Sequence, residues 1–228
     1  MRPETASVIR DFHAVYSGGL AEERRKSGEP NAMPPWAETR WLGRQISKCP
    51  MDLWVMQEIV WETRPELIVE CGTGGGGSAF FMASILDLAG GTGEVITVDT
   101  QSYPHLHRPD PRIRYLTGDS IDPKLVNFVR VAALGKLTMV VLDSHHTYEH
   151  VRAELDAYGG LVSPGCYLVV EDTGMSGAGD DLPADGNGQW CDRAVAEFLA
   201  ANPGYVRDRS REKHLLTSNG GGWIQRER

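Results

Sequence analysis

The stretch that most constrains the fold runs from residue 67 to residue 78 and reads LIVECGTGGGGS. An apolar run ends in the acid Glu70, and a glycine-packed turn then opens onto the apolar segment 79–88. This order is typical of a buried parallel strand, a tight loop and the start of a helix. Backbone amides in such a loop approach a ligand closely, and the helix end favours negatively charged groups. The stretch therefore predicts a site for a nucleotide-bearing cofactor.

From residue 67 onward, short apolar runs alternate with segments of helical periodicity. This alternation predicts an α/β fold with a mostly parallel sheet covered by helices on both faces. Near the end of the chain, the pattern predicts an antiparallel hairpin. Its segments are 205–208, 215–217 and the pair Trp223 and Ile224. The predicted strands are 67–71, 95–98, 113–116, 137–142 and 166–170, and the predicted helices are 78–88, 123–134, 147–162 and 192–201.

The N-terminal part of the chain has a different pattern. We expect residues 1–60 to form a helical extension that covers the substrate or contacts another subunit, and residues 61–228 to form the main domain. Apolar residues at helical spacing, from Val8 to Val15, predict an amphipathic helix. A second helix is predicted to begin at Pro50 and to stop at Arg64. The tryptophan-rich N-terminal third favours a homo-oligomer.

Composition limits the class of protein. The chain has 228 residues, of which 41% are hydrophobic, so it can bury a full core. A formal net charge of −8 argues against a general nucleic-acid binder. No run approaches the length of a membrane span, and the start lacks the apolar core of a signal peptide, so we expect a cytoplasmic protein. The four cysteines have no CxxC spacing, which favours buried free thiols over a disulfide or zinc site.

Acidic residues follow the predicted strands. Ligands bind beyond the carboxyl ends of the strands in an open α/β sheet, so acids at these positions should meet at one edge. A single such acid could instead cap a helix, but their joint occurrence favours a site. The acids at the strand ends are Glu70, Asp99, Asp119, Asp143, Glu171 and Asp172.

The glycine run satisfies the pattern GxGxxG, which alone is weak evidence for a dinucleotide. Asp99 could accept hydrogen bonds from ribose hydroxyls with either type of cofactor. Glu70 would crowd a pyrophosphate, but it could pair with the cationic amino group of a methionine-like cofactor. We therefore favour S-adenosylmethionine over NAD, and the absence of GxxxxGK[ST] excludes a P-loop. Residues of the turn expected at the cofactor are Gly72, Thr73, Gly74 and Ser78.

A second constellation comprises Asp143, Glu171 and Asp172. Three carboxylates at adjacent strand ends would repel one another unless a cation lay between them, and their oxygen atoms suit Mg²⁺, Mn²⁺ or Ca²⁺. Alternatively, they cap helices and bind water. His146 would project from the same loop and could act as a general base. His145 and His150 are expected to lie further from the reaction or on the surface.

Several stretches resemble the cephalosporin hydroxylase and rhamnosyl O-methyltransferase family. They are TRWLGRQISKCPMDLWVMQEIV, RPELIVECGTGGGGSAFFMASIL, VVLDSHHTYEHVRAELDAYGGLVSPGCYLVVEDT and DRSREKHLLTSNGGGW. The resemblance extends from about Trp36 to the C-terminus. It implies a Rossmann-like methyltransferase fold, S-adenosylmethionine as methyl donor, a hydroxyl acceptor and a divalent metal such as Mg²⁺.

The resemblance also implies roles for individual residues. Glu70, Gly72 and Asp99 would hold the cofactor, with Asp119 and Ser120 beside the adenine. We also expect Asp143 at the cofactor and in catalysis. Asp143, Glu171 and Asp172 would be metal ligands, and His146 falls where related macrolide-sugar methyltransferases have a base. His145 stands where sugar-methylating members have an acid, so the resemblance leaves the substrate subgroup open.

These observations favour an O-methyltransferase that acts on a sugar or another natural-product acceptor, as in antibiotic biosynthesis. Two other classes of protein stay open. One is an NAD-dependent oxidoreductase with a structural acidic cluster, and the other is a non-catalytic partner of a natural-product oxygenase. The polar segments 101–110 and 174–190 are expected to border the acceptor pocket, although ordinary surface loops would have the same composition.

Overall fold

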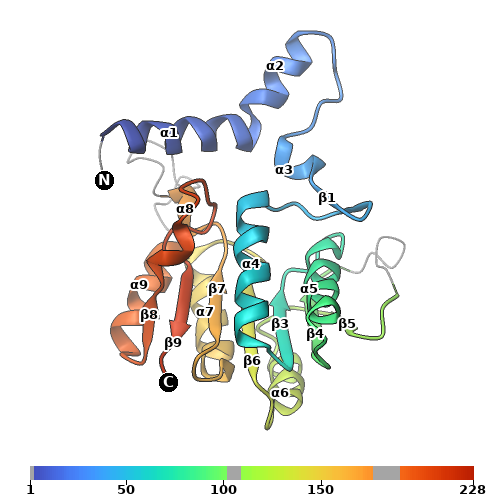
Figure 1. The fold of residues 1–228 in the computed structure, drawn as a ribbon, viewed down its shortest axis with the longest axis vertical. Helices are drawn as coiled ribbons and strands as arrows, with labels where there is room; N and C mark the ends of the chain where they lie inside the picture. Colours follow the sequence, from blue (N-terminus) through green and yellow to red (C-terminus); the bar gives the residue numbers. More distant parts are fainter. Residues whose placement is uncertain (1–2, 102–108, 177–190) are drawn as a thin grey trace.

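A single sheet forms the centre of the protein, seen in a computed structural model that describes residues 3–101, 109–176 and 191–228 (Figure 1). The described strands of this sheet have the order β5-β4-β3-β6-β7-β9-β8. Their bounds are β3 Leu67–Cys71, β4 Glu94–Asp99, β5 Ile113–Thr117, β6 Thr138–Leu142, β7 Tyr167–Val170, β8 Tyr205–Arg207 and β9 Trp223–Arg226.

The register of the parallel strands brings their carboxyl ends level. Cys71 at the end of β3 lies opposite Val98 of β4 on one side and Leu142 of β6 on the other. Leu142 in turn lies opposite Val170 of β7. The residues that follow these positions therefore meet at one edge of the sheet. Strand order reverses between β3 and β6, which is where open α/β sheets have their ligand crevice.

Helices cover both faces of the sheet, as predicted. Side chains alternate along a strand, so Ile68 packs with α4 and α5 on one face, while Leu67 and Val69 pack with α6, α7 and α9 on the other. Strands β3, β6 and β7 are buried throughout, which explains their continuous apolar sequences. The covering helices are α4 Pro50–Thr63, α5 Gly77–Leu88, α6 Pro123–Ala132, α7 Tyr148–Tyr158 and α9 Cys191–Ala201.

The N-terminal elements lie above the body in Figure 1. They are α1 Pro3–Ala14, the π-helical turn η1 Val15–Gly19, α2 Leu20–Lys26, α3 Pro35–Glu38 and the short pair β1 Arg40–Trp41 and β2 Arg44–Gln45. The predicted boundary after residue 60 falls inside α4. Because Val55, Met56 and Ile59 of α4 are buried against the sheet, this helix belongs to the core of the body.

The predicted C-terminal hairpin is wrong in one part. Strand β8 pairs directly with β9, and residues 215–217 form no strand. Leu215 has a left-handed backbone with φ 68°, and Thr217 and Ser218 donate hydrogen bonds to Asp52 of α4 instead. The predicted helix 147–162 also ends earlier, at Tyr158, and a 3₁₀ turn follows at Gly159–Leu161.

The remaining short elements are α8 Thr173–Ser176 and the 3₁₀ turn η3 Arg209–Glu212. All four cysteines are buried and free, as predicted. None of the described helices is long and apolar enough to cross a membrane. The expected acceptor segments 101–110 and 174–190 fall mostly outside the described residues.

Candidate active site

Two glycines allow the loops at the strand ends to pack without side chains between them. Gly72 has φ 101°, and a Cβ atom there would lie 1.9 Å from the backbone oxygen of Asp143. A Cβ atom on Gly77 would lie 2.0 Å from the backbone oxygen of Gln45. The glycine-rich turn therefore touches the end of β6 on one side and residues 45–47 on the other.

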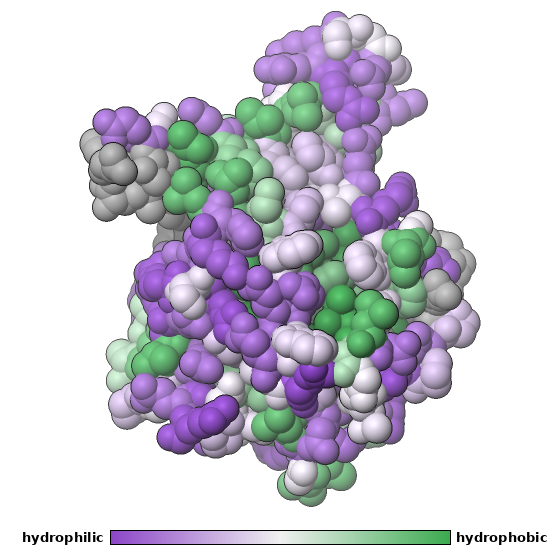
Figure 2. Space-filling view, in the orientation of Figure 1, coloured by the Kyte–Doolittle hydropathy of each residue, from purple (hydrophilic) through white to green (hydrophobic). Residues whose placement is uncertain are grey.

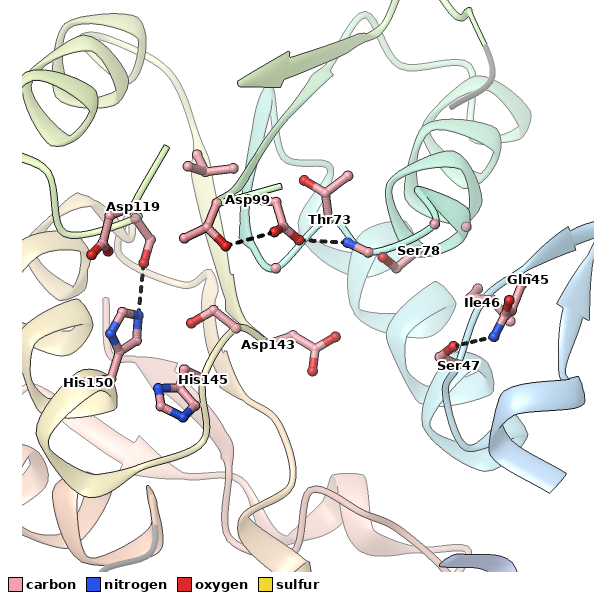
Figure 3. Close-up of a pocket in the computed structure, with 18 residues that line it drawn as sticks. Gln45, Ile46, Ser47, Thr73, Ser78, Asp99, Asp119, Asp143, His145 and His150 are labelled. Atoms are coloured by element: carbon pink, nitrogen blue, oxygen red, sulfur yellow. Dashed lines mark hydrogen bonds between the residues drawn. The ribbon is translucent and has the colours of Figure 1, made fainter. Parts of the chain in front are cut away.

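A cavity of about 490 Å³ opens between these loops (Figure 3). In it, Asp99 holds the turn in place, because its Oδ2 atom accepts a hydrogen bond of 2.9 Å from the Gly74 amide. Residues 45–47 form a wall that the sequence analysis missed. Eight of the residues predicted to bind the cofactor line this cavity: Gly72, Thr73, Gly74, Ser78, Asp99, Asp119, Ser120 and Asp143.

Glu70 is the predicted cofactor residue that does not line the cavity. Its carboxyl group is fully buried, with Oε2 2.6 Å from the hydroxyl of Thr97. That hydroxyl lies 2.7 Å from the hydroxyl of Thr73 on the cavity wall. Burial raises the pKa of Glu70 to about 7 despite the opposing charge of Lys48. Its Oε1 atom has no hydrogen-bond partner within the described parts of the chain.

The opposite wall of the cavity has a polar network around Glu154, a residue that the sequence analysis did not assign to the site. Glu154 is fully buried on α7, and its Oε1 atom accepts hydrogen bonds from Ser120 at 2.5 Å and Ser144 at 2.7 Å. His150 lies 3.1 Å from the Ser120 hydroxyl, and its hydrogen bond with Glu154 raises the pKa of His150. The sequence did contain a signal for this contact, because His150 and Glu154 are four residues apart in a predicted helix and therefore share one of its faces.

A second cavity, of about 440 Å³, contains the predicted metal and base residues. Asp143, Glu171, Asp172 and His146 all line it. The Nε2 atom of His146 lies 3.6 Å from Asp143 Oδ1 and 3.5 Å from Asp172 Oδ2. Since Asp143 also lines the first cavity, the two cavities meet at this residue.

The ammonium group of Lys48 lies where the acids converge. Its Nζ atom is 2.5 Å from Asp143 Oδ2 and 2.8 Å from Glu171 Oε2, and its side chain is only 5% exposed. Burial opposes this charge, but the neighbouring carboxylates outweigh it and raise the pKa of Lys48 above its usual value. Within residues 3–101, 109–176 and 191–228, no three His, Cys, Asp or Glu side chains are arranged to hold a metal as they stand.

Three carboxyl groups surround the single ammonium group of Lys48, so some of their oxygen atoms have no contact with it. Asp143 Oδ1 and Asp172 Oδ2 lie near His146, whereas Lys48 contacts Asp143 Oδ2 and Glu171 Oε2. Glu171 Oε1 is buried and has no hydrogen-bond partner in the described residues. Burial, followed by the charge of Asp143, raises the pKa of Glu171 well above its usual range, and burial also raises the pKa of Asp172.

The strand order and the cavity at the carboxyl ends of the strands define a Rossmann-like α/β fold. An apo structure of CmcI matches with a TM-score of 0.64 at 20% identity, covering 90% of this chain and 84% of the other. A structure of CmcI with Mg and S-adenosylmethionine gives 0.63 at 19% identity, with the same coverage. A putative caffeoyl-CoA O-methyltransferase from Staphylococcus aureus gives 0.54 at 17% identity, covering 90% and 93%.

A family model described as rhamnosyl O-methyltransferase/CmcI matches residues 34–227. A rhamnosyl O-methyltransferase of Mycobacterium bovis is 32% identical over 232 aligned positions, covering 99% of this chain and 87% of the relative. The enzyme of that name from Mycobacterium leprae is 31% identical, covering 92% and 86%. The chain therefore belongs to the rhamnosyl O-methyltransferase/CmcI family, which confirms the predicted resemblance. It is an S-adenosylmethionine-dependent O-methyltransferase, and the oxidoreductase and non-catalytic alternatives have no support.

Proposed function

We propose that this protein methylates a hydroxyl group of a sugar or another natural-product acceptor. S-Adenosylmethionine would bind in the first cavity, which the glycine-rich turn borders, and the acceptor hydroxyl would enter the second. The observation that carries this assignment is the position of Asp143 on the wall of both cavities. The donor carbon and the acceptor oxygen would meet beside this residue, and alignment of two reactants can lower a barrier by roughly 7–11 kcal/mol.

The residues that line the first cavity could bind the ribose and the adenine of S-adenosylmethionine. Asp99 would accept hydrogen bonds from the ribose, and Asp119 and Ser120 would lie beside the adenine. Glu70 does not line the cavity, so its buried carboxyl group would attract the cationic amino group from behind the cavity wall and would not contact it. Thr73, Gly74 and Ser78 complete the cavity on the side of α5.

A divalent cation fits the donor set of the second cavity. Asp143, Glu171 and Asp172 provide oxygen atoms that Lys48 does not contact, and oxygen is the donor that Mg²⁺ prefers. These three residues would hold the ion next to Lys48 and would relieve their mutual repulsion. A bound divalent ion would lower the pKa of the acceptor hydroxyl. The name of the CmcI structure, which includes Mg, supports this proposal.

His146 would accept the proton from the acceptor hydroxyl. Its Nε2 atom lies between Asp143 Oδ1 and Asp172 Oδ2, at 3.6 and 3.5 Å, so two carboxylates would orient the imidazole and stabilise it once it is protonated. Lys48 would hold Asp143 and Glu171 in position through its two contacts.

The names of the relatives favour a rhamnosyl acceptor. Tyr16 and Trp36 line the second cavity, and aromatic side chains with a polar atom suit the mixed surface of a sugar. The Tyr16 hydroxyl also donates a 3.0 Å hydrogen bond to the backbone oxygen of Lys48. The N-terminal extension would thus serve as a wall of the acceptor site.

The N-terminal extension would also join subunits of a homo-oligomer. Val8, Val15 and Leu20 are 52%, 48% and 37% exposed, and Figure 2 shows hydrophobic side chains on the visible face of the region where α1 lies. Light scattering after size exclusion would test this assembly. Val8→Ser combined with Val15→Ser should reduce the mass to that of a monomer, whereas a monomeric wild-type protein would contradict it.

Asp143→Asn tests the proposed reaction. The variant should bind S-adenosylmethionine in calorimetry with little change but lose methyl transfer to a rhamnoside, because the second cavity loses a charge. Asp156→Asn, a change of the same kind at an exposed position of α7, is the control and should keep its full rate. Full activity of Asp143→Asn in the presence of EDTA would contradict the role of the metal.

A further inference from the structure

A third cavity, of about 460 Å³, collects arginine side chains from distant parts of the chain. Arg10 comes from α1, Arg193 from α9, Arg207 from β8 and Arg209 from η3. Guanidinium groups repel one another, so a cluster of them favours a bound anion wherever acids do not neutralise it. Arg193 is already paired, because its Nε atom donates a 3.1 Å hydrogen bond to Glu197. The cavity has no residue in common with the first two.

Two of these guanidinium groups meet above Gly221. A Cβ atom at Gly221 would lie 3.6 Å from a terminal nitrogen of Arg207 and 3.8 Å from a terminal nitrogen of Arg209. Gly221 has φ 85°, and the hydrogen in place of a side chain leaves the space between these nitrogens open. The fork of an arginine matches the paired oxygens of a carboxylate or phosphate.

The cavity also contains buried polar atoms that the described residues leave without partners. The Nε atom of Arg207 is buried and has no hydrogen-bond partner in residues 3–101, 109–176 and 191–228. His13 is only 2% exposed, and neither of its ring nitrogens has a hydrogen-bond partner among those residues. A buried donor without an acceptor is costly, so a ligand that accepts hydrogen bonds would stabilise this arrangement.

Two acids line the cavity as well, but both are already engaged. Glu212 accepts hydrogen bonds from Arg209 at 2.7 and 3.0 Å and from the Gly221 amide at 2.8 Å. Asp192 accepts a hydrogen bond of 2.9 Å from the amide of Arg193. Burial, and then the charge of Arg209, lowers the pKa of Arg207, while the charges of Asp192 and Glu212 act in the opposite direction.

This cavity adjoins the proposed acceptor cavity. Asp172 lines the acceptor cavity and its neighbour Thr173 lines the arginine cavity. Likewise, Ser218 lines the acceptor cavity and its neighbour Thr217 lines the arginine cavity. The Gly174 amide donates a 2.7 Å hydrogen bond to the backbone oxygen of Ser218, which joins the two segments into one thin wall.

We propose that the arginine cavity binds an oxyanion, either a carboxylate or a phosphate, that belongs to the acceptor molecule. The methylated hydroxyl would lie beside Asp143, and the anionic group would lie beyond the wall formed by Thr173 and Thr217. The assignment of the anion to the acceptor rests on the proposed function, whereas the anion site itself rests on the arginines alone.

Calorimetry on the full chain, saturated with S-adenosylhomocysteine, tests the proposal with three probes: inorganic phosphate, rhamnose 1-phosphate and methyl rhamnoside. Phosphate should bind saturably, and rhamnose 1-phosphate should bind more tightly than either other probe. Arg207→Gln should weaken both phosphate-bearing probes at least about tenfold and leave methyl rhamnoside unchanged. Arg10→Gln, on an exposed part of α1, should weaken them by a smaller factor and provides a second variant if Arg207→Gln is unstable. Arg130→Gln, an exposed arginine on α6, is the matched control.

Absence of saturable phosphate binding, or equal effects of Arg207→Gln and Arg130→Gln, would overturn the anion site. Phosphate binding without an advantage for rhamnose 1-phosphate would overturn its assignment to the acceptor and leave a site for a free anion. Methyl transfer is measured separately. If no rhamnoside is methylated while phosphate binding still depends on Arg207, the proposed function fails and the anion site stands.

Discussion

Lys48→Met removes the cation that Asp143 and Glu171 share. The Nζ atom is 2.5 and 2.8 Å from these carboxylates and the lysine side chain is 5% exposed, so nothing else in the described residues replaces its charge there. Removal of one partner from a buried ion pair destabilises a protein by about 3–5 kcal/mol. We expect the free energy of unfolding at pH 8 to fall by about that amount.

Urea denaturation at several pH values measures this effect. The loss should be smaller at pH 5 than at pH 8, because Glu171, whose pKa burial already raises, can take up a proton in the variant once the opposing charge of Lys48 is gone. Lys213→Met is the matched control: Lys213 pairs with Glu58 but is 45% exposed, so its loss should be about 0–1 kcal/mol. Equal losses in the two variants would refute the role of Lys48 as the cation that balances the acids.

Three further changes probe the loops and buried acids of the site. Gly72→Ala should lower the free energy of unfolding by more than about 2 kcal/mol in urea denaturation, because its Cβ atom would overlap the Asp143 backbone, whereas Gly160→Ala, with open space around it, should have little effect. The pKa of Asp52 is raised to about 7 by burial, so the folded protein holds this proton while the unfolded chain loses it between about pH 4 and pH 7. Wild-type stability should therefore fall over that interval, by up to about 4 kcal/mol from this group, and Asp52→Asn should flatten the profile. His150→Gln should reduce the melting temperature at pH 6 more than at pH 9, because the raised pKa of His150 makes its charged form stabilising and that stabilisation is lost as pH rises through the folded value. A pH-independent difference would show that the His150–Glu154 contact does not depend on charge.

The sheet and the acids at its edge were predictable because each depends on short-range patterns. An apolar run that ends in an acid specifies both a buried strand and a side chain at its carboxyl end, and parallel pairing then aligns Asp143 with Glu171. The same reasoning placed Asp99 and Asp119 on one cavity.

Lys48 was not predictable in this way. It lies in a polar segment before α4, 95 residues from Asp143, and no periodic pattern connects the two. Glu154 was missed for a related reason, since its burial depends on Ser120 and Ser144 from two other loops. The predicted strand at 215–217 failed because Asp52, from α4, binds the backbone and hydroxyl of that segment. In each case a contact between distant segments overrides local preference.

Residues 45–48 line both cavities in succession, since Gln45, Ile46 and Ser47 line the first cavity and Lys48 lines the second and contacts the acids. A Cβ atom on Gly77 would lie 2.0 Å from the Gln45 carbonyl oxygen, so this segment packs directly against the start of α5. This continuous segment connects the walls of the two cavities, so a ligand bound in one cavity would act on the other through residues 45–48. By thermodynamic reciprocity, each substrate should then change the affinity of the other by the same factor.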